Sequence, residues 1–356
     1  MKVGWKQRAK RAPLVVAVLA LLIIGGWVVW QLGQGGEQEA PIPSPGEERP
    51  LEQVTTRVFS ADLAWSSPLA WKDAEDQATA ESASLPADVA VVGGRVFVLD
   101  TSNGRILELA PDGSVARILD SRVDERMALK GAMAMTAYTG KLYVANSGAG
   151  TVVVVDPSGR VDQVITPQVE AAERAVRPVG IAITASGQFF LSDPDNNRVL
   201  KLDGNGQQIA SIGTGKRDSG EYGLNAPGGL TLDSQGNLYV VDMLNYAVKK
   251  YSPDGQFLLS MGEAGDTEGT FSRPKAVAVD GQGNIYVSDG LLVAVEVFNP
   301  DGTYAGFIGR QDPADKESPP LFQAPHGLKI VGDKLYVIDR FAGLFQFQVG
   351  SAGSSS

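Results

Sequence analysis

Cysteine is absent from this 356-residue chain, and histidine occurs once, at His326. Without cysteine there can be no disulfide, no thiolate metal ligand and no thiol nucleophile. A zinc site needs three or four side-chain ligands, which one histidine cannot supply without cysteine. The Gly-x-Ser-x-Gly turn that presents a serine nucleophile is also missing. Thiol-dependent and zinc-dependent sites are therefore excluded, whereas a Ser-His-Asp site stays formally possible with one histidine but lacks its usual motif.

Basic residues are scarce as well. The chain has 31 Lys and Arg against 41 Asp and Glu, a net charge of −10. Lys2, Lys6, Arg8, Lys10 and Arg11 all lie at the extreme N-terminus, so the rest of the chain is more acidic still. Such a surface repels nucleic acid and anionic lipid headgroups. We expect no nucleic-acid partner.

One sequence pattern recurs six times. Its clearest copies are residues 227–242 and 274–289, and weaker copies start at Pro86, Lys130, Pro178 and Pro325. The starts are 44 to 51 residues apart. A period of about 40 to 50 residues with this content is typical of the blades of a β-propeller.

Each copy predicts four short strands. An apolar strand leads through a Gly-containing turn into a β-branched and aromatic strand, and two further strands follow, with a turn such as Pro253-Asp-Gly255 before the last. The second strand ends at an acid or amide in every copy: Asp100, Asn146, Asp193, Asp242, Asp289 and Asp339. Asp and Asn cap turns by accepting hydrogen bonds from backbone N–H groups, so we expect this role rather than a ring of metal ligands.

The last copy stops near Val349, after its third strand. The segment 56–60 resembles a lone strand, and we expect it to complete the sixth blade, which removes the open edges of the ring. The predicted fold is therefore all-β: a six-bladed propeller of four-stranded antiparallel blades over 51–349, with residues 51–60 as the closing segment. The Gly/Ser-rich tail, 350–356, is expected to be disordered.

The repeats resemble the NHL repeat family over roughly residues 86–349. The shared features are Pro-x-Gly before the first strand, Asp-x-x-Gly-Asn, Tyr-Val-x-Asp and Pro-Asp-Gly. The resemblance implies a propeller and a small set of known activities. One NHL-type lyase, which cleaves peptidyl-hydroxyglycine, uses a zinc site with several histidines, and His326 alone does not provide it. The family commonly has His in a Pro-His-Gly context, so a packed or loop-capping role is the alternative for His326.

The first fifty residues predict a membrane anchor. Residues 1–12 form a basic tip, and an apolar run continues over 13–32, long enough as a helix to span a bilayer core. Basic residues stay cytoplasmic, so the propeller is expected outside the cell, on a single-pass protein whose lipid partner is the bilayer. Residues 33–50, rich in Pro, Gly and Glu, are expected to be a spacer. A cleaved signal peptide is the alternative, but no Ala-x-Ala site follows the apolar run.

Propeller ligands usually bind over the central channel, where the loops into the innermost strands meet. That position is the residue after the opening proline of each copy: Ala87, Gly131, Val179, Gly228, Lys275 and His326. Gluconolactonase-like propellers hold a divalent cation there with carboxylates and amides, and such a cation needs several oxygen ligands. This row offers none, and Asp88, one position along, adds a single carboxylate. We therefore expect no metal and no cofactor.

Four basic residues are candidate ligand-binding residues at this mouth. Lys275 and His326 belong to neighbouring copies, and Arg273 and Arg177 precede an opening proline. If they share one face, they form a basic site for a carboxylate or phosphate group. The alternative is that they pair with nearby acids such as Glu268.

Two insertions and one apolar run are further candidates for contact surfaces. The insertion over 61–84 contains Trp65 and Trp71, which are interface candidates, and the second spans 310–323. The run 291–295 is unusually apolar, and a buried strand is the favoured interpretation, with a contact surface as the alternative.

The function we predict is a membrane-tethered binding or scaffold propeller in a bacterial cell envelope, whose partner is a protein, a peptide or an envelope ligand. It is predicted to be non-catalytic. A hydrolase or lyase of the lactonase type, acting over the channel, is one alternative, and a structural subunit of a membrane complex is another.

Overall fold

In the computed structural model, the described residues are 62–67, 85–170, 173–309 and 319–349, the first range as backbone only. The chain divides into two units, residues 1–55 and 56–356, and every described residue belongs to the second. The basic tip, the anchor helix, the spacer and the tail predicted from the sequence lie outside the described residues. Within the described ranges, no helix is long and apolar enough to cross a membrane.

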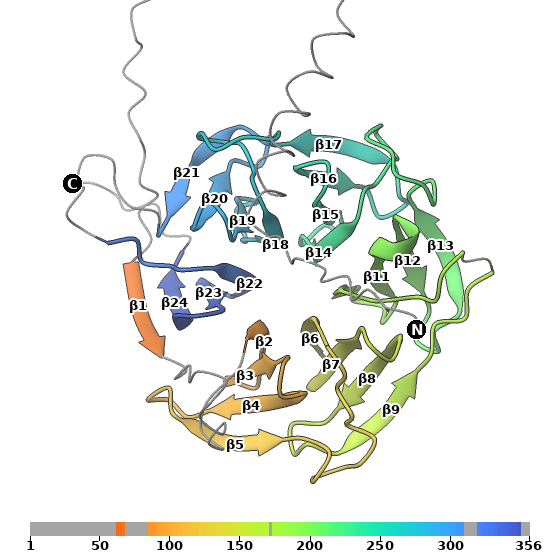
Figure 1. Cartoon of the computed structure of the whole chain (residues 1–356), viewed down its shortest axis with the longest axis vertical. Coiled ribbons are helices and arrows are strands. Elements are labelled where there is room, and N and C mark those ends of the chain that lie inside the picture. The colour runs from red at the N-terminus through yellow and green to blue at the C-terminus, as the bar shows by residue number, and fades with distance from the viewer. Residues whose placement is uncertain (1–61, 68–84, 171–172, 310–318, 350–356) are drawn as a thin grey trace, which may run out of the picture. The chain divides into compact units, whose positions relative to one another are not determined.

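The second unit is a six-bladed β-propeller, seen along its central channel in Figure 1. Blades 1 to 3 comprise β2 (Pro86–Val92), β3 (Arg95–Asp100), β4 (Arg105–Leu109) and β5 (Val115–Leu119); β6 (Ala134–Tyr138), β7 (Lys141–Asn146), β8 (Thr151–Val155) and β9 (Val161–Ile165); and β10 (Gly180–Ile183), β11 (Phe189–Asp193), β12 (Arg198–Leu202) and β13 (Gln208–Ile212). Blades 4 and 5 comprise β14 (Pro227–Leu232), β15 (Leu238–Asp242), β16 (Ala247–Tyr251) and β17 (Phe257–Met261); and β18 (Pro274–Val279), β19 (Ile285–Asp289), β20 (Ala294–Phe298) and β21 (Tyr304–Ile308). Each is an antiparallel sheet with its first strand innermost, as predicted.

The sixth blade joins the two ends of the ring. It contains β22 (Pro325–Val331), β23 (Lys334–Asp339) and β24 (Gly343–Gln348), and its outer strand is β1 (Asp62–Ser67). β1 pairs antiparallel with β24, from Asp62 opposite Gln348 to Ser67 opposite Leu344. Closure by an N-terminal strand is therefore confirmed, but the strand lies just after the predicted 56–60, which is outside the described residues. Trp65, an interface candidate, belongs to β1 opposite Gln346; Trp71 lies outside the described residues.

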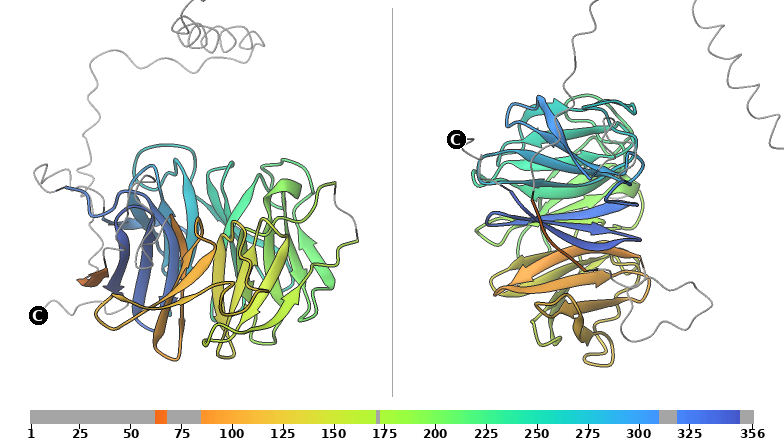
Figure 2. Two further views of the ribbon diagram at one scale, coloured as in Figure 1. Left: turned by 60° about the horizontal axis from the view of Figure 1, so that its bottom comes forward. Right: turned by 90° about the vertical axis from the view of Figure 1, so that its left-hand side faces the viewer.

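The hydrophobic core is divided among the spaces between blades. Six buried clusters each join two neighbouring blades, and one of them packs Val98 and Leu107 of blade 1 against Ile338 and Leu344 of blade 6. A blade thus has neighbours on both faces, which explains the apolar runs of the middle strands: β11, β15 and β19 are buried along their whole length. Figure 2 shows from the side how the connecting loops gather at the two rims of the ring.

The acids that end the second strands cap turns, as predicted from the sequence. Asp339 accepts hydrogen bonds from the backbone N–H groups of Gln323, Ala324, Phe341 and Ala342 at 2.7 to 2.9 Å. The connections that follow share one feature in every blade, since the fourth residue after the acid or amide always has a positive φ: Gly104, Gly150, Asn197, Tyr246, Val293 and Gly343. In blade 3 the connection includes a short 3-10 helix, Pro194–Asn196. The run 291–295 was interpreted wrongly in part. Leu291 lies in this connection of blade 5, 65 % exposed, and only Ala294 and Val295 enter β20.

Neighbouring first strands approach closely around the channel at three glycines, Gly180, Gly229 and Gly327. A Cβ on Gly327 of β22 would lie 2.5 Å from the backbone oxygen of Ala87, and one on Gly229 of β14 would lie 2.7 Å from the Cα of Ala276. The third position of Pro-x-Gly therefore has a packing reason: a side chain there would push two blades apart.

Candidate functional site

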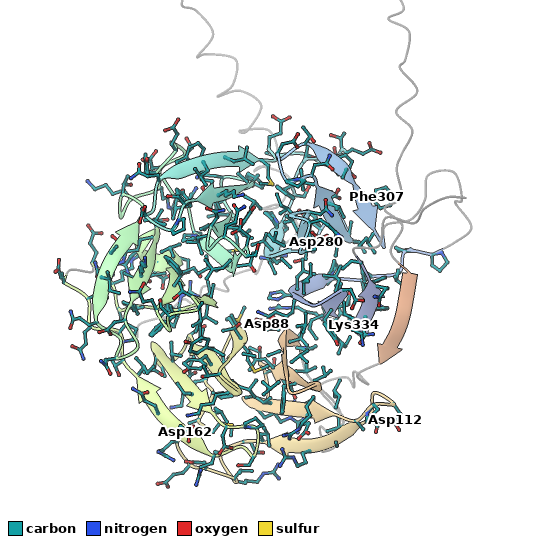
Figure 3. The ribbon with its side chains drawn as sticks, turned by 180° about the vertical axis from the view of Figure 1, so that it is seen from behind. Asp88, Asp112, Asp162, Asp280, Phe307 and Lys334 are labelled. Atoms are coloured by element: carbon teal, nitrogen blue, oxygen red, sulfur yellow. The ribbon has the colours of Figure 1, made fainter. Side chains whose placement is uncertain are left out.

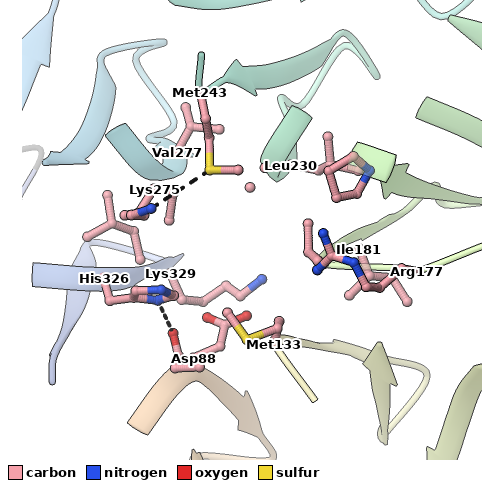
Figure 4. Close-up of a pocket in the computed structure, with 18 residues that line it drawn as sticks. Asp88, Met133, Arg177, Ile181, Leu230, Met243, Lys275, Val277, His326 and Lys329 are labelled. Atoms are coloured by element: carbon pink, nitrogen blue, oxygen red, sulfur yellow. Dashed lines mark hydrogen bonds between the residues drawn. The ribbon is translucent and has the colours of Figure 1, made fainter. Parts of the chain in front are cut away.

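A pocket of about 170 Å³ opens at the central channel (Figure 4). It is lined by Ala87, Asp88, Met133, Arg177, Val179, Ile181, Pro194, Gly228, Gly229, Leu230, Met243, Lys275, Ala276, Val277, His326, Gly327, Leu328 and Lys329. Five of the six residues predicted at the channel mouth are therefore in one pocket. The exception is Gly131; Met133 supplies the lining from blade 2.

His326 has both ring nitrogens in hydrogen bonds. Nδ1 lies 2.9 Å from the backbone oxygen of Ala87 in blade 1, and Nε2 lies 2.9 Å from Nη2 of Arg340. An arginine only donates, so Nε2 accepts and Nδ1 carries the proton that is donated to Ala87. Burial first, and then the charge of Arg340, lower the pKa of His326 to about 3. His326 is therefore a neutral link between blades 6 and 1 that also orients Arg340.

Three cations lie near this histidine, and of the three only Lys275 lines the pocket. Arg273, Lys275 and Arg340 form no ion pair with any carboxylate of the described residues. The Lys275 ammonium instead lies 3.9 Å from Sδ of Met243 (Figure 4). Burial lowers the pKa of Lys275, and the positive charges of Arg273 and Arg340 lower it further, against the smaller opposing effect of Asp289. We call these three residues the cation trio.

Arg340 supplies a second observation about this site. Burial, and then the charge of Arg273, lower its pKa, and its Nε is buried without a hydrogen-bond partner in the described part of the chain. A buried guanidinium N–H without an acceptor is costly, because the lost hydration is not replaced. An anion beside the trio would supply both the acceptor and the missing negative charge.

Arg177, the fourth predicted residue, lies across the pocket from Lys275 and His326 (Figure 4). Its guanidinium makes a two-pronged ion pair with Asp195, at 2.7 and 2.8 Å. Pairing with a nearby acid, the alternative given by the sequence, therefore holds for Arg177. Its partner is Asp195 rather than Glu268, the acid that the sequence suggested. Glu268 forms no ion pair with Arg273.

Deeper in the channel wall, Asp88 and Lys329 face each other from blades 1 and 6. Figure 3 shows Asp88 at the inner margin of the ring, and Figure 4 shows it near Lys329. Asp88 accepts hydrogen bonds from the backbone N–H groups of Val89 and Met135, while Lys329 donates to Thr136 Oγ1 at 3.1 Å. Burial raises the pKa of Asp88 to about 6, against the opposing effect of Lys329.

Arg340 is the main site residue that the sequence pattern did not single out. It follows the strand-ending Asp339, at the position where Met243 and Pro194 line the pocket in blades 4 and 3. Lys329 was missed too, because an isolated lysine in a strand carries no motif. Comparing the residue after each strand-ending acid across the six copies would have found Arg340. No group of three His, Asp or Glu side chains that could hold a metal ion exists among the described residues.

Comparisons with known proteins support the fold. No family model and no curated protein matches the sequence. Among solved structures, a gluconolactonase from Xanthomonas campestris is similar with a TM-score of 0.55 and 16 % identity over 75 % of this chain and 87 % of that chain. A streptogramin B lyase has a TM-score of 0.51 and 15 % identity over 75 % and 94 %.

A protein of unknown function from Bacteroides thetaiotaomicron has a TM-score of 0.59 and 17 % identity over 80 % of this chain and 74 % of that chain. At these identities the likeness concerns the six-bladed fold alone.

Proposed function

We propose that this protein is a binding module that binds a carboxylate or phosphate group of its ligand at the mouth of the central channel, beside Lys275. The observation that carries the proposal is the cation trio of Arg273, Lys275 and Arg340, which has no ion-paired acid among the described residues although the chain as a whole is acidic. Three like charges destabilise the free site, and a bound anion relieves both their repulsion and the unmet N–H of Arg340.

We further propose that the propeller is an NHL-type, membrane-tethered, extracytoplasmic protein. Support comes from the repeat motifs and from the basic tip, the apolar run and the spacer of the first fifty residues. In this setting the anionic group would belong to a protein, a peptide or an envelope ligand. Protease treatment of intact cells tests the topology: the propeller is expected to be cut, and its survival until lysis would contradict the proposal.

Anion binding is tested with acetate and inorganic phosphate as probes, by calorimetry or NMR on the full-length protein at low ionic strength. The Lys275→Met variant keeps the apolar stem and removes the charge, so its affinity is expected to fall about tenfold or more. Lys201, which stacks over Phe190 away from the trio, gives the matched control Lys201→Met. Equal affinity of Lys275→Met and the parent would rule the site out.

One observation favours an enzyme as the second candidate. The pocket contains Asp88, whose pKa is about 6, and a carboxyl that titrates near neutral pH suits general acid–base catalysis. Two of the similar structures are a lactonase and a lyase. Hydrolysis of lactones, or ring-opening of a streptogramin, that disappears in Asp88→Asn would favour this candidate. No turnover, together with unchanged anion binding in Asp88→Asn, would favour the binding module.

A further inference from the structure

Three consecutive blades carry exposed apolar side chains at one equivalent position. Because a residue with a positive φ lies four positions after the strand-ending residue in all six blades, the second residue after that strand end is comparable around the ring. These residues are Ser102, Gly148, Asp195, Leu244, Leu291 and Phe341. Only blades 4, 5 and 6 have large apolar side chains there, and they are 51 %, 65 % and 43 % exposed. We call Leu244, Leu291 and Phe341 the apolar arc.

The apolar arc lies on the same rim of the ring as the cation trio. In each of the three blades the strand-ending Asp is directly opposite the opening proline, as in Pro274 and Asp289. The turn that follows is bonded to the loop before that proline: Leu244 N–H donates to Asn225 O, Gly290 N–H to Arg273 O and Arg340 N–H to Ala324 O. Arg340 is also the residue immediately before Phe341.

Hydrogen bonds to Asp289 fix the backbone of the turn that carries Leu291. The Leu291 and Leu292 N–H groups donate to Asp289 Oδ1 at 2.9 and 3.0 Å, so the backbone beneath Leu291 is fixed. The turn ends at Val293 with a φ of +58°, a conformation that a β-branched residue rarely adopts. Backbone strain of this kind persists where the surroundings enforce it, and it gathers at binding sites.

We propose that blades 4 to 6 form a docking surface for an acidic peptide segment of a partner protein, with its apolar side chains on the arc and one carboxylate at the cation trio. The proposal rests on the proposed binding function and specifies the partner. Charge complementarity selects the occupant, since Arg273, Lys275 and Arg340 are three cations on one rim, and the arc adds apolar contacts that a free phosphate or a nucleic acid would not use. Blades 1 to 3 offer Ser102, Gly148 and Asp195 instead, so the peptide is expected to cross half of the ring.

The test uses the full-length protein and short fluorescent peptides that alternate Glu with Leu, with Lys–Leu and Glu–Ser versions as references. The double variant L244S/L291S changes exposed side chains only, so it is expected to fold. It should bind the Glu–Leu peptide about tenfold or more weakly, because two leucine contacts are lost. L258S is the matched control: Leu258 is 49 % exposed on the outer strand β17, and its replacement should leave the affinity unchanged.

Anion binding separates this inference from the proposed function. L244S/L291S should bind acetate and phosphate as the parent does, whereas Lys275→Met should lose both anion and peptide. If the parent binds the Lys–Leu or Glu–Ser peptide as tightly as Glu–Leu, or if the double variant binds Glu–Leu like the parent, the docking surface is refuted while the anion site stands. A parent that dimerises in sedimentation and a double variant that is monomeric would instead assign the arc to a second copy of this chain.

Discussion

Asp289 offers the sharpest test of how the rim is built. Its buried carboxylate accepts four backbone hydrogen bonds: Oδ2 from the N–H groups of Ser272 and Arg273 at 2.8 and 2.7 Å, and Oδ1 from those of Leu291 and Leu292. One side chain therefore fixes a residue of the cation trio and a residue of the apolar arc. Its removal should loosen both.

The magnitude follows from these four bonds. A donor left unsatisfied costs about 1 to 3 kcal/mol, and these donors are partly buried, so water replaces some of the loss. We expect Asp289→Ala to lower the free energy of unfolding by about 3 to 5 kcal/mol. Asp289→Asn keeps one oxygen and two of the bonds but turns an amide N–H₂ toward the other two donors. Its loss should be about half as large.

Urea unfolding of the full-length protein, followed by circular dichroism at one pH and temperature, measures both variants. Asp301→Ala is the matched control, since Asp301 caps an exposed turn through Thr303 alone and should leave the unfolding midpoint at the parent value. A loss below about 1 kcal/mol for Asp289→Ala, or an equal loss in Asp289→Asn, would refute the reasoning from hydrogen-bond count.

Three further predictions concern the seam between blades 6 and 1. Gly327→Ala should lower the free energy of unfolding by about 1 to 3 kcal/mol in urea titrations, because its Cβ would meet Ala87 O, whereas Gly281→Ala, with open space, should not. His326 stays neutral in the folded protein, but in the unfolded chain it takes up a proton below about pH 6.5. Its contribution to the free energy of unfolding should therefore fall as the pH drops from about 6.5 towards 3. An equal dependence of the free energy of unfolding on pH in His326→Gln would contradict this. The Asp88 carboxyl should titrate near pH 6 when followed by NMR. Because folding raises its pKa, its contribution to the free energy of unfolding should decrease as the pH rises from about 4 to 6. A titration near pH 3.8 would contradict the argument that burial raises this pKa.

Much of the fold could be predicted because the same local sequence signals recur in all six copies of the repeat. Turn glycines, apolar strands and capping acids agree with one another in each copy, so blade number and strand ends followed. The closing strand was misplaced because neither 56–60 nor 62–67 has a distinctive pattern. The choice depends on pairing with β24, a contact between residues almost 300 positions apart.

The candidate site was predictable only in part. The row after each opening proline located the pocket, because strand starts converge on the channel. The ion-pair partners of the basic residues could not be assigned from one sequence. Arg177 forms an ion pair with Asp195, while Lys275 forms none with any acid of the described residues. The run 291–295 has the composition of a buried strand, but the hydrogen bonds of Asp289 and the left-handed Val293 place its first residues in an exposed turn.

The pairing of β1 with β24 sets the order in which the ring is completed. During synthesis the outer strand of blade 6 is made first, yet its partner, Gly343–Gln348, is made last. Five blades can therefore form before β1 has its partner, and the ring then closes when β1 pairs with β24. Until that step, β24 is an open edge on which a second chain could add a strand. The first strand of the propeller can therefore pair only after the last strand has been made, and its pairing is what covers that edge.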